Sequence, residues 1–125
     1  MVKFYTASLF SEKDDSLAIS LRIEDELGWV SNASWLKGGE VGLSRAQISE
    51  LDLSDVESAD NFVIVSHPRG TPKPGGGRWV EFGYALALGK TCYVIGPYEN
   101  VFCHDLRVVV YPTVTCLISD LKVQD

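Results

Sequence analysis

The sequence lacks most of the features that direct a chain to a membrane or to nucleic acid. Its 125 residues contain no apolar run near the roughly 18 residues of a membrane span, and the first residues show no signal-peptide pattern. Basic residues are scarce: 11 Lys and Arg stand against 17 Asp and Glu, for a formal net charge of −6. A nucleic-acid polymer needs a basic face, whereas a nucleoside carries little charge. We therefore expect a cytoplasmic protein with no membrane or nucleic-acid partner.

Cysteine is also rare, and the three residues are Cys92, Cys103 and Cys116. An odd count without CxxC spacing predicts reduced thiols rather than a disulfide framework. His104 directly follows Cys103, but adjacent residues of an extended chain point to opposite faces, and no second ligand pair is visible. We expect neither a metal nor another cofactor.

Apolar runs alternate with helical segments along the whole chain. The hydrophobic share of 46% is high enough to exclude a disordered chain, and the length suits one domain over residues 1–125. Ser44 to Gln47 fits a capping box at the start of a helix. The alternation predicts an α/β fold, a flavodoxin-like or Rossmann-like three-layer sandwich with a parallel sheet of about five strands. We expect strands at residues 2–7, 29–36, 62–66, 91–96 and 107–111, with helices at 14–27, from 44, at 78–88 and at 114–121.

The most informative stretch runs from Asn61 to Lys90. It predicts a buried strand, a long loop, and a helix that is apolar on almost every side and should therefore be buried. The first turn of this helix nevertheless carries a carboxylate, Glu81. In α/β proteins the mouth of a strand–loop–helix unit is the usual place for a ligand site. Three glycines before Glu81 would let the backbone approach a ligand closely: Gly75, Gly76 and Gly77.

The same loop carries cations that could meet a phosphate, namely Arg69, Lys73 and Arg78. Loop cations are more often simply solvated, and neither a GxGxxG pattern nor a P-loop Lys-Ser/Thr is present. Phosphate binding by these residues is therefore one of two interpretations.

Three side chains are expected to converge at one edge of the sheet: Tyr5 near the end of the first strand, Asp52 in the helix from Ser44, and Glu81. Tyr5 has an alternative interpretation as a core aromatic. An acid at the position of Glu81 could simply be favoured by the helix N-terminus, but that would not explain the glycines before it. Trp35 could stack on a planar ligand or pack in the core.

The segment WVEFGYALALGKTCYVIG at residues 79–96 resembles the signature of the nucleoside 2-deoxyribosyltransferase family. In that family Glu-Leu-Gly-Tyr-Ala and then Gly-Lys precede a strand. The upstream run LDLSDVESADNFVIV is similar to the family's Asn-Asp, seven-residue spacer and Asp before a buried strand, and KFYTASLF resembles its first strand, with a tyrosine in the same place. The resemblance is strongest over residues 50–96.

This resemblance implies that Glu81 is a nucleophile that attacks C1′ of a deoxyribosyl group and forms a covalent glycosyl-enzyme, as in retaining glycosidases. Asp52 would lie near the base or assist its protonation, and Tyr5 would hydrogen-bond Glu81. The family also implies a homo-oligomer whose subunits lend residues to each other's sites. Asn100 and Phe102 are the candidates for such contacts, although a plain turn with a packed Phe explains them equally well.

The leading interpretation is transfer of a 2-deoxyribosyl group between nucleobases, with a nucleoside and a free nucleobase as partners. The alternative is an N-glycosidase that hydrolyses deoxynucleoside 5′-monophosphates. A third interpretation is a module that binds a nucleotide without turning it over, because Gly75 stands about where the family places an aspartate.

Overall fold

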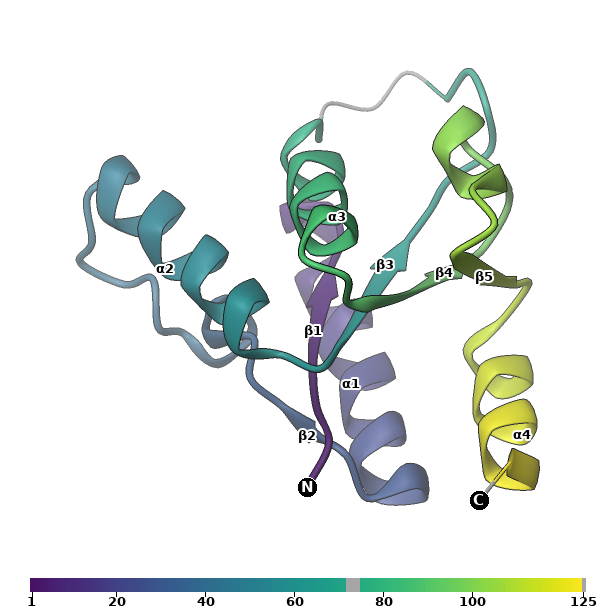
Figure 1. Ribbon diagram of the computed structural model, residues 1–125. Helices are drawn as coiled ribbons and strands as arrows, with labels where there is room; N and C mark the ends of the chain where they lie inside the picture. The colour runs from purple at the N-terminus through teal and green to yellow at the C-terminus, as the bar shows by residue number, and fades with distance from the viewer. Residues whose placement is uncertain (72–74, 125) are drawn as a thin grey trace.

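Five parallel strands form the centre of the molecule in the computed structural model, which describes residues 1–71 and 75–124 (Figure 1). The strands are β1 (Lys3–Ala7), β2 (Val30–Ser31), β3 (Asn61–Val65), β4 (Thr91–Ile95) and β5 (Val108–Tyr111), in the order β2-β1-β3-β4-β5. The helices are α1 (Lys13–Leu27), α2 (Arg45–Ser58), α3 (Gly77–Ala87) and α4 (Val114–Gln124), with short 3-10 helices η1 (Phe10–Glu12), η2 (Ser34–Lys37) and η3 (Val101–His104). The predicted α/β fold with a parallel sheet is confirmed.

The helices cover both faces of the sheet. Helices α2 and α3 pack together on one face, and α1 and α4 pack together on the other. Neighbouring strand residues point to opposite faces, so Tyr5 and Phe62 belong to the core under α2 and α3, whereas Phe4 and Val63 belong to the core under α1 and α4. This arrangement makes a three-layer sandwich.

The predicted strand at residues 29–36 is wrong in its extent. Only Val30 and Ser31 pair with β1, and the chain then turns into η2. Two hydrogen bonds to Asp55 draw it off the sheet: the Asn32 side-chain amide donates to the Asp55 carbonyl at 2.8 Å, and the backbone N–H of Ser34 donates to the Asp55 carboxylate at 3.0 Å. These tertiary contacts replace further strand pairing.

The prediction that the third long helix is buried on all sides is also wrong. In α3 only Arg78, Phe82 and Ala85 are buried, and the Val80 side chain lies largely in solvent. The helix packs against the sheet and α2, and its opposite side leaves Val80 exposed.

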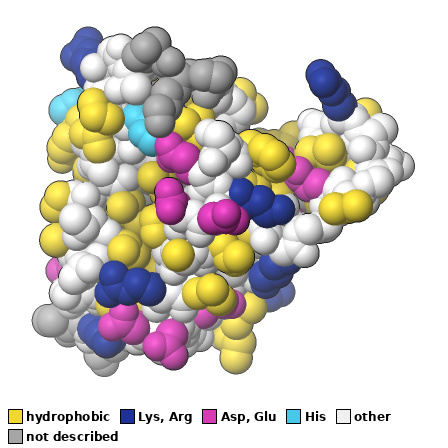
Figure 2. Space-filling view, turned by 180° about the vertical axis from the view of Figure 1, so that it is seen from behind, with side chains coloured by type: hydrophobic (Ala, Val, Ile, Leu, Met, Phe, Trp, Pro, Cys, Tyr) yellow, Lys and Arg dark blue, Asp and Glu magenta, His cyan; other side chains and the backbone are white. Residues whose placement is uncertain are grey.

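Helix α2 carries the predicted capping box at its start. The Ser44 hydroxyl accepts from the backbone N–H of Gln47 at 3.2 Å, and the Gln47 side chain accepts from the backbone N–H of Ser44 at 2.9 Å. The first half of α2 and the loop before it stand out from the body of the molecule (Figures 1 and 2). This projecting arm forms one wall of the site described next.

Candidate active site

A cavity of about 610 Å³ opens at the carboxyl edge of the sheet, between the projecting arm and the first turn of α3. Tyr5 from β1, Asp52 from α2 and Glu81 from α3 all line it. Three distant segments of the chain thus bring the three predicted side chains into one cavity, at the edge where open α/β sheets bind ligands. Its volume lies in the range of small-molecule sites.

Tyr5 and Glu81 are in direct contact. The Tyr5 hydroxyl donates a hydrogen bond to Oε2 of Glu81 at 2.6 Å. The Tyr5 ring is buried and stacks on Phe62, with ring centroids 5.8 Å apart. Burial, followed by the charge of Glu81, raises the pKa of Tyr5 well above its ordinary value, so the phenol stays protonated. Tyr5 is therefore both a core aromatic and a fixed donor to Glu81.

Burial in the same cavity raises the pKa of Glu81 to about 7. The hydrogen bond from Tyr5 acts in the opposite direction and favours the carboxylate, while the charges of Glu40 and Asp55 add to the rise. Glu81 therefore changes its charge near neutral pH.

Asp52 is half-buried, and its pKa is raised further, to about 8. Burial is the largest cause, followed by a hydrogen bond with Glu40 and then by the charge of Glu81. Oδ1 of Asp52 is buried without a hydrogen-bond partner among the described residues. Within residues 1–71 and 75–124, no donor comparable to Tyr5 favours the ionised form of Asp52.

The surroundings of Glu81 and Asp52 make one carboxyl ionise more readily than the other. The Tyr5 hydroxyl favours the ionised form of Glu81, whereas the hydrogen bond with Glu40 favours the protonated form of Asp52, so Glu81 is the carboxyl that loses its proton first. A pair of acids separated in this way can supply a nucleophile and a proton donor at the same pH.

Glu40 is a site residue that the sequence did not reveal. It lines the cavity and interacts with both carboxyls, yet the sequence around it, Lys37-Gly-Gly-Glu40, looks like an ordinary polar loop. Ser8 and Ser11, just after β1, also line the cavity. Their position after a strand at the carboxyl edge was the signal that could have identified them.

Of the three predicted glycines, Gly75 and Gly77 line the cavity and Gly76 does not. Gly75 has a φ of +141°, and a Cβ there would lie 2.0 Å from Cδ2 of Leu9. The positive φ favours glycine at this position, and an aspartate there would also have to displace the Leu9 side chain.

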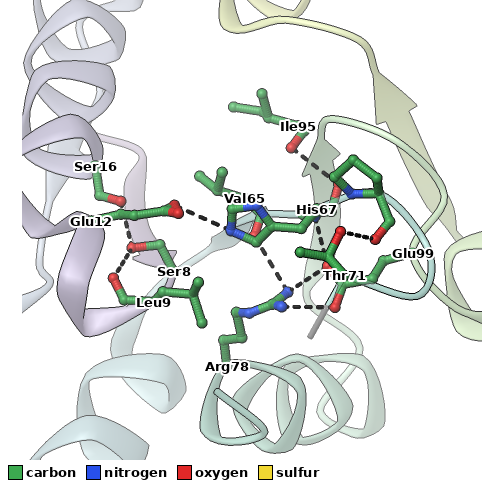
Figure 3. A network of polar contacts seen from close by, with 12 residues as sticks. Ser8, Leu9, Glu12, Ser16, Val65, His67, Thr71, Arg78, Ile95 and Glu99 are labelled. Atoms are coloured by element: carbon green, nitrogen blue, oxygen red, sulfur yellow. Dashed lines mark hydrogen bonds and ion pairs between the residues drawn. The ribbon is translucent and has the colours of Figure 1, made fainter. Parts of the chain in front are cut away.

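Arg78 lines the cavity, but it is not the free cation that phosphate binding would need. Its side chain is buried, and its two terminal nitrogens donate to Glu99 at 2.9 and 2.7 Å (Figure 3). Arg69 is exposed and is not among the cavity residues, and Lys73 lies outside the described residues.

Asn100 and Phe102 do not line the cavity of their own chain. The Asn100 side chain accepts from the backbone N–H of Phe102 at 3.0 Å and caps η3, and the Phe102 ring is exposed. A contact of these residues with a second subunit stays a prediction. Trp35 lines the cavity, with its indole N–H donating to the Thr6 carbonyl at 2.9 Å.

In residues 1–71 and 75–124, no group of three or more His, Cys, Asp and Glu side chains could hold a metal ion. The same part of the chain has no helix with the length and apolar character to cross a bilayer. All three cysteines are free thiols.

No protein-family model matches the chain, and a search of curated proteins finds no match. Among solved structures the chain is similar to the CMP N-glycosidase BcmB of Clostridium botulinum, with a TM-score of 0.67 and 19% sequence identity. The match covers 97% of this chain and 98% of that one. The two proteins share an α/β Rossmann-like fold over nearly their whole lengths.

Proposed function

We propose that this protein is an N-glycosidase that hydrolyses the bond between base and sugar in a nucleoside or nucleotide, with Glu81 as the nucleophile. The observation that carries the proposal is the pairing in one cavity of Glu81, held by the Tyr5 hydroxyl, with Asp52, whose carboxyl keeps its proton to higher pH. The fold shared with a CMP N-glycosidase supports the same class of reaction.

In the first step the Glu81 carboxylate attacks C1′ and forms an ester bond to the sugar. The C1′–N bond breaks, its electron pair goes to the base, and Asp52 gives the base its proton. In the second step water attacks C1′, the ester bond breaks, and Glu81 is released as a carboxylate. The water loses one proton to Asp52, which restores the starting state. Tyr5 holds Glu81 in line for both steps.

Transfer of the sugar to a second base is the competing outcome of the same intermediate. The segment around Glu81, which resembles the deoxyribosyltransferase signature, favours it. A base that enters before water would attack C1′ in the second step and leave as a new nucleoside.

Chromatography of reaction mixtures distinguishes these outcomes. We would incubate the protein with cytidine, deoxycytidine and their 5′-monophosphates, and separately with deoxyinosine plus free adenine. Free base alone supports the N-glycosidase, and deoxyadenosine from the second mixture would assign transfer. Glu81→Gln is expected to abolish either reaction, whereas Asp105→Asn, a change in an exposed ion pair with Arg107, should have no effect.

Mass spectrometry of the protein during turnover tests the covalent step. A sugar adduct on Glu81 is expected. If no substrate releases base, while a nucleotide raises the melting temperature of both the native chain and Glu81→Gln, the protein is a binding module and the proposal is wrong.

A further inference from the structure

Glu99 lies in the loop between β4 and η3 and does not line the cavity, yet its carboxylate joins three segments of the chain. It accepts from the backbone N–H of His67 after β3 at 2.6 Å and from the Trp79 indole at 3.1 Å. It also accepts from both terminal nitrogens of Arg78. Four donated hydrogen bonds fill the sites of an ionised carboxylate, so Glu99 has no capacity left for a ligand.

These contacts hold the first turn of α3. The helix begins without any side-chain cap on its N-terminus, and the glycines before it restrain the backbone little. Arg78 and Trp79 are its second and third residues, and Glu81 is its fifth, one helical turn after Arg78. The Glu99 carboxylate therefore supplies the anchor that a capping side chain would give elsewhere.

The same carboxylate neutralises the cation beside the nucleophile. The Arg78 guanidinium and the Glu99 side chain point toward each other in Figure 3, and the Arg78 side chain is only 4% exposed. Its remaining nitrogen, Nε, has no hydrogen-bond partner among the described residues. Burial alone would raise the pKa of Glu99, but the donors around it hold that pKa below its usual value, so the ion pair persists at neutral pH.

We propose that Glu99 is a positioning residue for Glu81: it anchors the first turn of α3 and holds the Arg78 guanidinium away from the nucleophile. This inference rests on the proposed role of Glu81. Without the Glu99 charge, Arg78 would be a buried cation with no counter-ion, one helical turn from Glu81 and already at the cavity wall. The ionisable groups that act on Glu81 in the native chain are Tyr5 from β1, Asp55 from α2, Glu40 from the loop before α2, and Asp52 across the cavity. Loss of the Glu99 charge would add the Arg78 guanidinium to them.

The test compares Glu99→Gln, Glu99→Asp and the control Asp105→Asn, which removes a carboxylate from an exposed pair nearby in sequence. For Glu99→Gln we expect kcat to fall about tenfold or more with KM changed much less, because a displaced catalytic group slows chemistry rather than binding. Glu99→Asp keeps the charge and should recover part of the loss. Asp105→Asn should behave as the native protein.

A second readout does not depend on turnover. The titration of the Glu81 carboxyl carbon is followed by NMR and assigned with Glu81→Gln. In Glu99→Gln its midpoint should move to lower pH, because the released guanidinium favours the carboxylate, and it should stay in place in Glu99→Asp and Asp105→Asn. If the native protein has no glycosidase activity, the proposed function fails, and this titration still decides the role of Glu99.

A folded Glu99→Gln protein with the native kcat or an unmoved Glu81 titration would overturn the inference. If Glu99→Gln does not fold, the double variant Arg78→Met with Glu99→Gln removes both charges and replaces the buried pair with an apolar side chain. A kcat about tenfold below native in that folded protein supports the anchoring role, and a native kcat overturns it.

Discussion

Replacing Tyr5 by Phe would remove one hydrogen bond from the site and little else. The ring is buried and stacked on Phe62, and Phe can keep both contacts. The lost bond is the 2.6 Å donation to Glu81. A hydrogen bond to a charged group contributes about 1.5–3 kcal/mol, and we take the lower value, because water in the open cavity can partly replace the phenol. About 1.5 kcal/mol corresponds to about a tenfold change in an ionisation equilibrium.

The Tyr5→Phe change should therefore move the pKa of Glu81 further above about 7. At pH 6, where native Glu81 is mostly protonated, the variant should release base about ten times more slowly. The ratio of the two rates should approach one as the pH rises past the Glu81 pKa of the variant. The assay is initial base release between pH 5.5 and pH 9, measured by chromatography.

Tyr84→Phe is the matched control. Tyr84 lies on the same helix as Glu81, but its hydroxyl donates to Glu57 and it does not line the cavity. This variant should follow the native profile at every pH. Equal rates of Tyr5→Phe and native protein at pH 6 would refute the reasoning. A loss of constant size at every pH would show that Tyr5 orients Glu81 without setting its ionisation.

Three further predictions concern the carboxyls and the glycine of the site. Because the pKa of Glu81 is raised from near 4.5 to about 7, ionisation of Glu81 lowers the free energy of unfolding. This loss begins as the pH rises past about 4.5 and is complete above about 7. Glu81→Gln should therefore gain up to about 3 kcal/mol over the native protein at pH 8 and nothing at pH 4, which urea unfolding at both values measures. Since Asp52 keeps its proton up to about pH 8, the kcat of the native protein should fall above that pH. Asp52→Asn should lower kcat about a hundredfold or more and remove this fall at high pH. A fall at high pH that is unchanged in Asp52→Asn would exclude Asp52 as the proton donor. Gly75→Ala places a Cβ against Leu9 at a φ of +141° and should lower stability by about 1–3 kcal/mol in thermal unfolding, whereas Gly83→Ala, in open space on α3, should be neutral or stabilising.

The sheet could be predicted from the sequence because its strands are short, continuous apolar runs that only a doubly covered parallel sheet buries. The same criterion fails at residues 29–36. That run has the composition of a strand, but hydrogen bonds from Asn32 and Ser34 to Asp55 divert it. Asp55 lies more than 20 residues further along the chain, so no local pattern indicates these contacts.

The candidate site also contains residues that the sequence indicates and residues that it does not. Tyr5, Asp52 and Glu81 are predictable, because each lies in a segment whose type and order the sequence indicates. Glu40 and Glu99 are not, because both lie in loops and act only through partners brought close by the fold. Arg78 is the clearest example of a contact that the sequence does not indicate. The sequence suggests that its side chain could bind a phosphate, whereas the fold pairs it with Glu99.

The charge of the cavity bears on what it can stabilise. Glu40, Asp52 and Glu81 line it, and Arg78, its one lining cation among the described residues, is already paired. Breaking a glycosidic bond builds positive charge at C1′, and the Glu81 carboxylate, held by the Tyr5 hydroxyl, stabilises that charge more strongly in the transition state than in the neutral ground state. The same carboxylate opposes a phosphate dianion at the lining. A preference for monophosphates would therefore require donors other than Arg78, and the ratio of kcat/KM for deoxycytidine and its monophosphate measures whether such donors operate.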